Sequence, residues 1–357
     1  MLRKVFYYNL EAGGEIMKSR NVWSNDGIEI YDNEVWFVPF ETNVLCSYSL
    51  SERKVNRIFT LNEWEVSSGI SYNTIEFEEN IISIPGRGEG IYFVDKDKKI
   101  NIYDKIGDGI EEKYDCAVKF NSSVYIFPLG EQEILKVSMD KMEKIEWNGG
   151  GVSSAVVYND NIYFTNVTNS VFKIDKDDKI KRCIISGIDE VNNICFWKNS
   201  AIVLSKDGQV SLVDLEENKV IKQPLSIGEG DFFSSSVVLN DRLYLFPYKD
   251  STTIWIYDLE NQKIHHIKIE KGDKYNEEWE YNAFGHSTVY ENKIYVMSPS
   301  NNALIVINQD EIETIYIDLK PNEEEQFEYM RKAFEHGILV EENDFSSLKT
   351  MIKYMEK

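Results

Sequence analysis

The chain has 357 residues, of which 42% are hydrophobic and 13% aromatic, a composition that excludes a disordered or collagen-like protein. Its 39 basic and 61 acidic side chains give a formal net charge of −22. Such a charge repels phosphate backbones and anionic bilayers, so we expect neither nucleic acid nor a membrane as partner. The length allows two ordinary domains, although all-β architectures of this size often form one.

The N-terminal residues and the cysteines favour a cytoplasmic protein. The first ten residues hold only a short apolar stretch, and Glu11 and Glu15 follow it, without the apolar core or cleavage site of a secretion signal. No apolar run approaches the ~18 residues of a membrane span. No cysteine pair has Cys-x-x-Cys spacing, and we expect free thiols at Cys46, Cys116, Cys183 and Cys195.

One sequence unit recurs along the chain. A polar turn precedes an apolar, often aromatic pair, and proline frequently follows, as in 33–39 and 80–85. The intervals between successive copies run from 38 to 51 residues, which is the length of a four-stranded propeller blade, ~40–50 residues. The apolar residues that follow the seven turns are Val35, Ile81, Val124, Ile162, Ala201, Leu243 and Ile294.

Each unit predicts four strands in chain order. A strand such as 154–158 precedes the turn, and the strand of the apolar pair follows it. A third strand ends in an acidic residue, as in 254–258, and a fourth strand such as 263–269 completes the unit. Alternating apolar and polar residues are typical of strands, and the Asn-Asp turns tolerate the left-handed backbone of tight hairpins.

Seven such units predict an all-β fold, a seven-bladed β-propeller over residues 1–320, because closing the ring protects the sheet edges. Six blades plus an irregular unit is the alternative, since the copy at Ala201 is the weakest. Either Val5–Asn9 adds a strand to the last blade, or residues 314–318 complete that blade.

Residues 20–320 resemble kelch-like and WD-like β-propellers. The feature closest to kelch is a strand and turn followed by Asn-x-Ile-Tyr and by an apolar strand that ends in aspartate. The kelch Gly-Gly doublet is replaced by Pro39, Pro85, Pro128 and Pro247, and the Gly-His and Trp-Asp pairs of the WD type are missing. The resemblance implies the fold and no particular function, because propellers serve many functions.

Residues 321–357 predict a C-terminal extension of two short amphipathic helices. Glu323–Glu325 place negative charge at the N-terminus of the first, where the helix dipole favours it. We expect the apolar faces to dock on the propeller, or to bind a partner protein or a second copy of the chain. The residues of these faces are Phe327, Met330, Phe334, Leu348, Met351 and Ile352.

The loops that enter each blade, and those between second and third strands, are expected to meet around one end of a central channel. Aromatic, amide and charged side chains in such loops suit a protein or glycan ligand. An ordinary set of polar loops that closes the channel is the alternative. The ligand-binding candidates are Trp23, Trp64, Arg87, Tyr114, Asp231, Tyr248, Phe284 and His286.

Four loop segments carry motifs that have an alternative structural interpretation. Gly86–Gly90 permits close backbone approach, so that Arg87 either clamps a carboxylate or phosphate or lies in a flexible hairpin tip. Gly149–Gly151 suits an anion nest, but it lacks the Lys-Ser/Thr of a phosphate-binding loop, so we do not expect a nucleotide there. Asp95–Asp97 and Asp175–Asp178 lack the glycine and glutamate of a calcium loop, so we expect hairpin turns, no metal and no cofactor.

The sequence favours a non-enzymatic scaffold or adaptor that binds a protein or glycan on its loop-rich face. The alternative is a hydrolase or lyase acting on a sugar or peptide, with His286 as general base, Asp231 or Asp115 as its partner across the channel, and Arg87 nearby. A structural subunit of a larger assembly is a third possibility. No Ser-His-Asp signature and no zinc-ligand spacing is recognisable.

Overall fold

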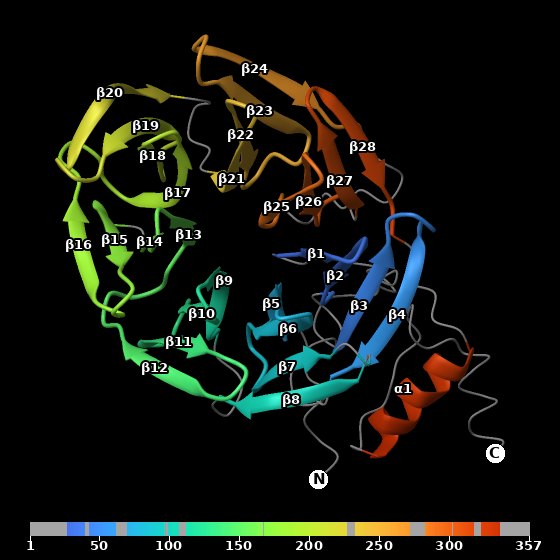
Figure 1. The fold of residues 1–357 in the computed structure, drawn as a ribbon. Coiled ribbons are helices and arrows are strands. Elements are labelled where there is room, and N and C mark those ends of the chain that lie inside the picture. Colours follow the sequence, from blue (N-terminus) through green and yellow to red (C-terminus); the bar gives the residue numbers. More distant parts are fainter. Residues whose placement is uncertain are drawn as a thin grey trace, which may run out of the picture. The chain divides into compact units, whose positions relative to one another are not determined.

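The computed structural model describes residues 27–39, 43–61, 70–95, 97, 99–106, 112–166, 168–226, 233–271, 283–301, 303–317 and 323–335. The chain divides into two compact units, one of Met1–Asn21 with Lys320–Lys357 and one of Val22–Leu319. The second unit contains seven four-stranded antiparallel sheets, which follow one another in a ring (Figure 1).

Each blade takes its four strands from consecutive residues. In blades 1 to 4 the strands are β1 (Glu29–Tyr31), β2 (Glu34–Phe37), β3 (Val44–Ser49), β4 (Lys54–Thr60); β5 (Ser71–Phe77), β6 (Asn80–Pro85), β7 (Gly90–Val94), β8 (Ile100–Lys105); β9 (Tyr114–Phe120), β10 (Ser123–Pro128), β11 (Glu133–Val137), β12 (Met142–Glu146); and β13 (Ser154–Tyr158), β14 (Asn161–Thr165), β15 (Ser170–Ile174), β16 (Ile180–Ile184). In blades 5 to 7 they are β17 (Val191–Trp197), β18 (Ser200–Ser205), β19 (Gln209–Asp214), β20 (Lys219–Ser226); β21 (Phe233–Leu239), β22 (Arg242–Pro247), β23 (Thr253–Asp258), β24 (Lys263–Lys268); and β25 (Ser287–Tyr290), β26 (Lys293–Ser298), β27 (Ala303–Asn308), β28 (Glu311–Ile315).

The seven-bladed prediction is confirmed and the six-bladed alternative is wrong. The weak copy around Ala201 forms a complete blade, β17–β20, because its apolar residues are as deeply buried as those of the other blades. Residues 314 and 315 end β28 and so belong to the last blade, whereas Val5–Asn9 lie outside the described residues. Among the described strands none is exchanged between blades 1 and 7, and an ion pair between Arg53 and Glu313 joins those two blades.

The proline of the repeat ends the second strand at a β-bulge. Pro85, Pro128 and Pro247 each pair with the first strand of their blade just beside a register shift. Proline donates no N–H, so it fits where the ladder of hydrogen bonds is already interrupted. Blade 5 has the same shift beside Ser205, with Asn192 as the extra residue. These bulges re-aim the side chains at the start of the first strands.

The turns between first and second strands are tight. In five blades both turn residues have positive φ, as type I′ hairpins require. Asparagine and aspartate adopt this conformation more readily than glutamate does. Blade 2 nevertheless has glutamate at both positions, Glu78 (φ 50°) and Glu79 (φ 64°), and blade 7 has Glu291 (φ 46°).

Replacing Glu79 by glycine is expected to raise the free energy of unfolding by about 0.5–1 kcal/mol. The left-handed conformation costs an L-residue ~1–2 kcal/mol, which exceeds the entropy that glycine loses on folding. Urea unfolding of the two proteins measures the difference. Asn159→Gly is the matched control and should gain less, because asparagine already tolerates its φ of 44°. A loss of stability in Glu79→Gly contradicts the expectation.

The core lies between neighbouring blades. The strands β6 and β10 are buried along their whole length, because each is covered on both faces by adjacent sheets. Between blades 3 and 4, Phe127, Trp147, Phe164 and Phe172 form one cluster of buried aromatic rings.

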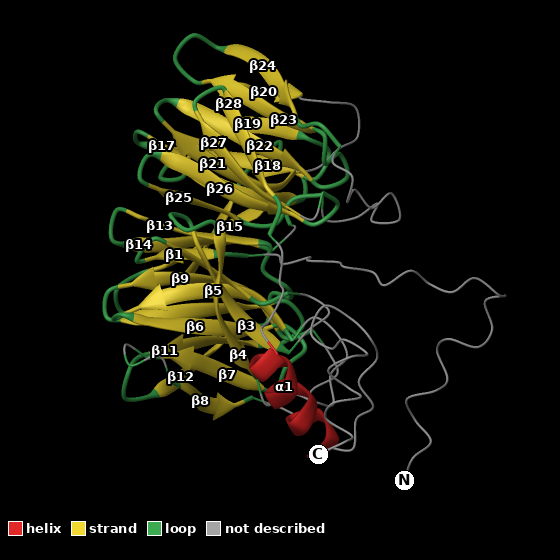
Figure 2. Cartoon of the chain, turned by 90° about the vertical axis from the view of Figure 1, so that its right-hand side faces the viewer, coloured by secondary structure: helices red, strands yellow, loops and turns green. Residues whose placement is uncertain are grey.

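Figure 2 shows the strands of the propeller from the side, with short turns at the left edge of the blades.

The C-terminal extension contains the helix α1 (Glu323–Glu335), which begins at the predicted run of glutamates. Met330 is buried and Phe327 half-buried, and Arg331 forms ion pairs with Glu328 and Glu335 along the helix. The side chain of Phe334, the second predicted helix and its residues Leu348, Met351 and Ile352 lie outside the described part of the chain. No helix in that described part is both long and apolar enough to span a bilayer.

Candidate functional site at the entry end of the ring

The first strand of each blade lies nearest the centre of the ring (Figure 1). In the contacts between blades, the start of one first strand lies beside the start of another. The turn after one first strand likewise lies beside the turn after another. Asp115 and His286, near the starts of their strands, contact each other, and the turn residues Asn240 and Asn292 share a hydrogen bond. We call the end of the ring at which the first strands begin the entry end. The end with the turns between first and second strands is the hairpin end.

An aspartate and a histidine from blades that are not neighbours meet at the entry end. Nε2 of His286, directly before β25 in blade 7, lies 3.4 Å from Oδ1 of Asp115 in β9 of blade 3. The two side chains are 25% and 19% exposed. Asp115 Oδ1 is buried and accepts no hydrogen bond from the described residues, so the two side chains are in close contact without hydrogen-bond geometry. The carboxylate therefore keeps acceptor capacity for another group.

A second buried acceptor lies at the start of β17. Asn192, the extra residue of the blade 5 bulge, donates from Nδ2 to the Phe233 carbonyl at 3.1 Å. Its Oδ1 is buried and has no hydrogen-bond partner among the described residues. A buried polar atom without a partner costs free energy, which a ligand's donor recovers. Like Asp115, Asn192 thus offers a buried oxygen that can accept a hydrogen bond.

Small polar side chains hold the first strands together around this site. Ser236 donates to Asn193 Oδ1 at 2.6 Å, which joins blades 5 and 6. The hydroxyls of Ser235 and Ser287 lie 2.9 Å apart and join blades 6 and 7. The Ile194 N–H donates to Ser154 at 3.4 Å, which joins blades 4 and 5. These hydrogen bonds therefore hold the first strands of blades 4 to 7 in place around the entry end.

Arg87 binds a carboxylate of its own chain. Its Nη2 lies 2.9 Å from Oε1 of Glu112, which also accepts the Tyr72 hydroxyl at 3.1 Å. The N–H groups of Gly86 and Gly88 both donate to the Ile70 carbonyl. A side chain at Gly88 is excluded, because its Cβ would lie 2.7 Å from that carbonyl oxygen.

The ammonium of Lys113, which is only 3% exposed, donates to the carbonyls of Arg87 and Gly88 at 3.3 and 3.2 Å. The Gly86–Gly90 loop is thus fixed by hydrogen bonds rather than a flexible tip. Sequence reasoning missed Glu112 and Lys113, because their role arises from contact with a loop about 25 residues upstream.

Two of the predicted ligand-binding aromatics belong to the core instead. Tyr114 pairs with Pro128 at the bulge and is buried, and Phe284 packs on Phe246 with ring centroids 5.6 Å apart. Burial, together with the nearby Glu131 and Glu133 carboxylates, raises the pKa of Tyr114. Neither ring offers a free face to a ligand.

Of the four remaining candidates, one lies in the described part of the chain and three lie outside it. Tyr248 is half-buried, and its carbonyl accepts the Ala283 N–H at 2.7 Å. Trp23, Trp64 and Asp231 lie outside the described residues. Within the residues that the structure describes, no group of three or more His, Cys, Asp or Glu side chains is arranged to hold a metal ion.

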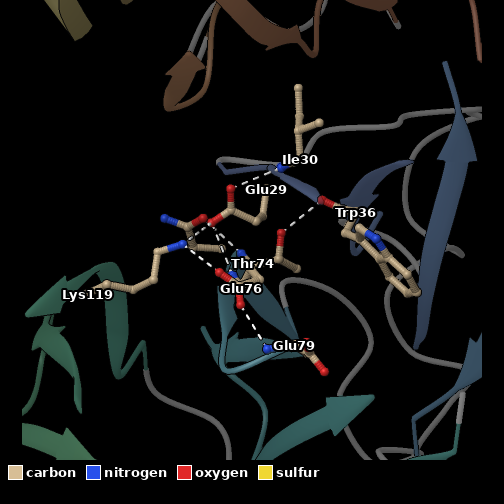
Figure 3. A network of polar contacts seen from close by, with 8 residues as sticks. Glu29, Ile30, Trp36, Thr74, Glu76, Glu79 and Lys119 are labelled. Atoms are coloured by element: carbon tan, nitrogen blue, oxygen red, sulfur yellow. Dashed lines mark hydrogen bonds and ion pairs between the residues drawn. The ribbon is translucent and has the colours of Figure 1, made fainter. Parts of the chain in front are cut away.

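A separate polar network lies near the hairpin end (Figure 3). Glu29 of blade 1 accepts the backbone N–H of Glu76 in blade 2 at 3.1 Å. Lys119 of blade 3 donates to Glu76 Oε2 at 2.8 Å and lies 3.8 Å from Glu29 Oε2. Burial raises the pKa of Glu29, and the attraction of Lys119 opposes this shift. The network joins three blades and leaves no open acceptor comparable to Asp115.

The fold defines the chain as a seven-bladed β-propeller, and comparison with known proteins gives that class alone. No family model and no curated protein matches the sequence. The streptogramin B lyase structure has a TM-score of 0.61 and 12% identity, covering 78% of this chain and 92% of its own. The kelch-type resemblance is not confirmed.

Two further solved structures share the fold. The WD40 β-propeller domain of Doa1 has a TM-score of 0.58 and 15% identity, covering 82% of this chain and 95% of that domain. BamB from Moraxella catarrhalis has a TM-score of 0.57 and 10% identity, covering 80% and 84%. These identities are too low to transfer a function.

Proposed function

We propose that this protein is a non-enzymatic scaffold that binds a partner protein at the entry end of its ring. The observation that carries the proposal is the Asp115–His286 pair, which joins two distant blades and leaves Asp115 Oδ1 buried without a hydrogen bond. Together with the similar Oδ1 of Asn192, the site offers hydrogen-bond acceptors on first strands that hydrogen bonds hold in place. The ligand therefore brings N–H or O–H donors.

Charge and fold support a protein as that ligand. The net charge of −22 attracts basic side chains, which are rich in donors. A WD40 domain and BamB among the structural neighbours support an interaction propeller. Glycan hydroxyls are donors too, and a glycan array run with the purified protein tests that ligand class. All four cysteines are free, which supports a reducing cytoplasm.

Affinity purification of the tagged full-length chain from its host, with mass spectrometry, tests this function. Asp115→Ala/His286→Ala is expected to lower recovery of a stoichiometric partner about tenfold, equivalent to ~1.4 kcal/mol. The matched control is Asp140→Ala/His266→Ala, which removes an exposed aspartate and histidine outside the entry end. Equal recovery with both variants contradicts the proposal.

The C-terminal extension is tested in parallel. Deletion of residues 322–357 distinguishes binding at the entry end from binding to the extension. A partner that is lost only on deletion binds the extension and not the ring. Melting curves of each purified variant verify that the propeller is folded.

A hydrolase or lyase is the second candidate, and the same residue pair favours it. A carboxylate beside an imidazole orients it as a general base once their contact shortens to a hydrogen bond on substrate binding. Arg87 is engaged by Glu112 and Asp231 lies outside the described residues, so this candidate depends on His286 and Asp115. Turnover of sugar or peptide substrates that His286→Asn abolishes would support it. Binding without turnover supports the scaffold.

A further inference from the structure

The hairpin end carries a row of apolar side chains. Val157, Phe196, Val238 and Val289 each occupy the next-to-last position of the first strand in blades 4 to 7. Val157 and Val289 are 39% and 42% exposed, and the other two are half-buried. We call these four residues the apolar arc. In blades 1 to 3 the same position holds Ile30, which is buried, and the charged Glu76 and Lys119, so the arc covers one part of the ring only.

The arc is held in place by contacts between its blades. The rings of Tyr158 and Phe196 stack with centroids 4.0 Å apart and planes 4° from parallel. Three hydrogen bonds link successive turns: Tyr158 to the Lys198 carbonyl at 2.5 Å, Trp197 Nε1 to Asp241 at 2.7 Å, and Asn240 to Asn292 at 3.1 Å. A fixed surface needs little ordering on binding, which favours affinity.

A groove of about 350 Å³ adjoins the arc between blades 5 and 6. Trp197, Leu212 and Leu259 provide apolar walls. The ammonium of Lys198 lies 4.3 Å from the Trp197 ring centroid and 3.0 Å from Glu260. The groove thus already holds one cation between an aromatic face and a carboxylate, an arrangement that also suits a lysine or arginine from outside.

The turns around the arc are acidic. Among the fourteen residues of the seven turns, all of them described, Lys198 is the one base. It is also paired with Glu260. Glutamate occupies positions 78, 79 and 291 although their positive φ disfavours it. The acidic residues, all exposed, are Asp32, Glu78, Glu79, Asp160, Asp241 and Glu291.

We infer that the hairpin end is a docking surface for a cationic amphipathic segment of a partner protein. Apolar side chains of the segment cover the arc. Its lysines and arginines lie against Asp160, Asp241 and Glu291, and one of them takes the place of Lys198 over Trp197. This surface lies at the opposite end of the ring from the Asp115–His286 site and stands independently of it.

Charge complementarity selects this occupant over others. Helix α1 of a second copy is a poor match, because its thirteen residues hold five glutamates against one arginine and one lysine. Nucleic acids and anionic lipids are repelled by the same acidic turns. A segment with an apolar face and a basic face matches both the apolar arc and the acidic turns.

Fluorescence anisotropy of the full-length chain with a labelled probe tests the inference. The probe is a peptide of leucine and lysine, about 18 residues long, so that a helix of ~5 turns has one apolar face. A peptide of the same composition in scrambled order, which lacks that face, is the control. The scrambled peptide is expected to bind about tenfold more weakly, and equal binding of the two peptides overturns the inference.

The apolar arc is tested by Val157→Asp/Val289→Asp. The matched control is Ile184→Asp/Ile221→Asp, on exposed side chains of the outer strands β16 and β20. The arc variant is expected to weaken probe binding at least about tenfold and the control less than about twofold. Equal effects of the two variants overturn the inference, because both add two negative charges.

The acidic turns are tested by Asp160→Asn/Asp241→Asn/Glu291→Gln. The matched control, Asp140→Asn/Glu216→Gln/Glu217→Gln, removes three exposed acids from outer turns and changes the net charge equally. A loss of about tenfold for the first and less than about threefold for the second supports the inference. Equal losses show diffuse attraction to an acidic protein and overturn it.

A measurement on the unaltered protein covers the case in which a variant fails to fold. The amphipathic probe carries a photo-activated diazirine on one leucine. Cross-links to residues 157–160, 196–198, 238–241 or 289–292 are expected. Cross-links confined to other parts of the ring overturn the inference.

Discussion

Phe164→Ala is expected to lower the free energy of unfolding by about 3–5 kcal/mol, the usual cost of removing a fully buried phenylalanine ring. Phe164 lies in β14 and is fully buried. The centroids of Phe127, Trp147 and Phe172 lie 5.1, 5.0 and 5.3 Å from its own. The alanine leaves a cavity between blades 3 and 4 that these large rings cannot fill without moving.

Urea unfolding followed by tryptophan fluorescence measures the loss. Phe164→Leu keeps most of the volume and should cost less than about 1.5 kcal/mol. Ile184→Ala, at an exposed site on β16, should stay within about 0.5 kcal/mol of the parent protein. A cost for Phe164→Ala no greater than that of Ile184→Ala contradicts the inter-blade core.

Lys119→Met is expected to cost about 1–2 kcal/mol at neutral pH. It removes the hydrogen bond to Glu76 and the cation nearest Glu29, and the half-exposed position of Lys119 keeps the loss below that of a fully buried pair. Burial already raises the pKa of Glu29 in the folded protein, and removal of Lys119 raises it further. Ionised Glu29 then destabilises the fold more strongly than before.

The sign of the pH dependence follows from this shift. An acid whose folded pKa exceeds its unfolded value lowers stability as the pH rises through the folded pKa. The cost of Lys119→Met is therefore largest above the folded pKa of Glu29. It fades below its ordinary pKa of 4.5, where Glu29 is protonated in both states.

Unfolding of the Lys119→Met variant at neutral and acidic pH tests this expectation. Adding Glu29→Gln should recover part of the loss at neutral pH. Lys144→Met is the matched control, because its ion pair with Glu133 is exposed, and should cost at most about 1 kcal/mol. A cost that is the same at both pH values contradicts the assignment.

The number and order of the blades could be predicted from the sequence because each blade is built from consecutive residues. The spacing of the apolar residues that follow each turn depends only on local strands and turns. The turn at Asn159-Asp160 has the positive φ values that its residue types indicate. The start of α1 at Glu323 was likewise predictable from local charge.

The candidate site was predictable only in part. Asp115 and His286 both lie near the start of a first strand, which made a pair conceivable, but the ring geometry determines that they meet. The alternation of side chains fails near a bulge, because one extra residue turns the neighbouring side chains to the other face. This is why Tyr114 is buried although its loop position indicated a ligand surface.

The contacts of Arg87 and the apolar arc depend on the arrangement in space. Glu112 approaches Arg87 from the loop that precedes the next blade. The valines of the arc look like ordinary strand residues, and their shared exposure emerges only when equivalent positions of four blades are placed around one axis. No pattern within a single repeat contains this information.

Hydrogen–deuterium exchange of the full-length chain, with and without the purified partner, tests the central claim most directly. Partner binding at the entry end predicts slower exchange in residues 112–117, 190–194 and 283–287, around Asp115, Asn192 and His286. Unchanged exchange in these three segments, with protection confined to the hairpin end, the outer strands or residues 323–335, would contradict a binding site at the entry end.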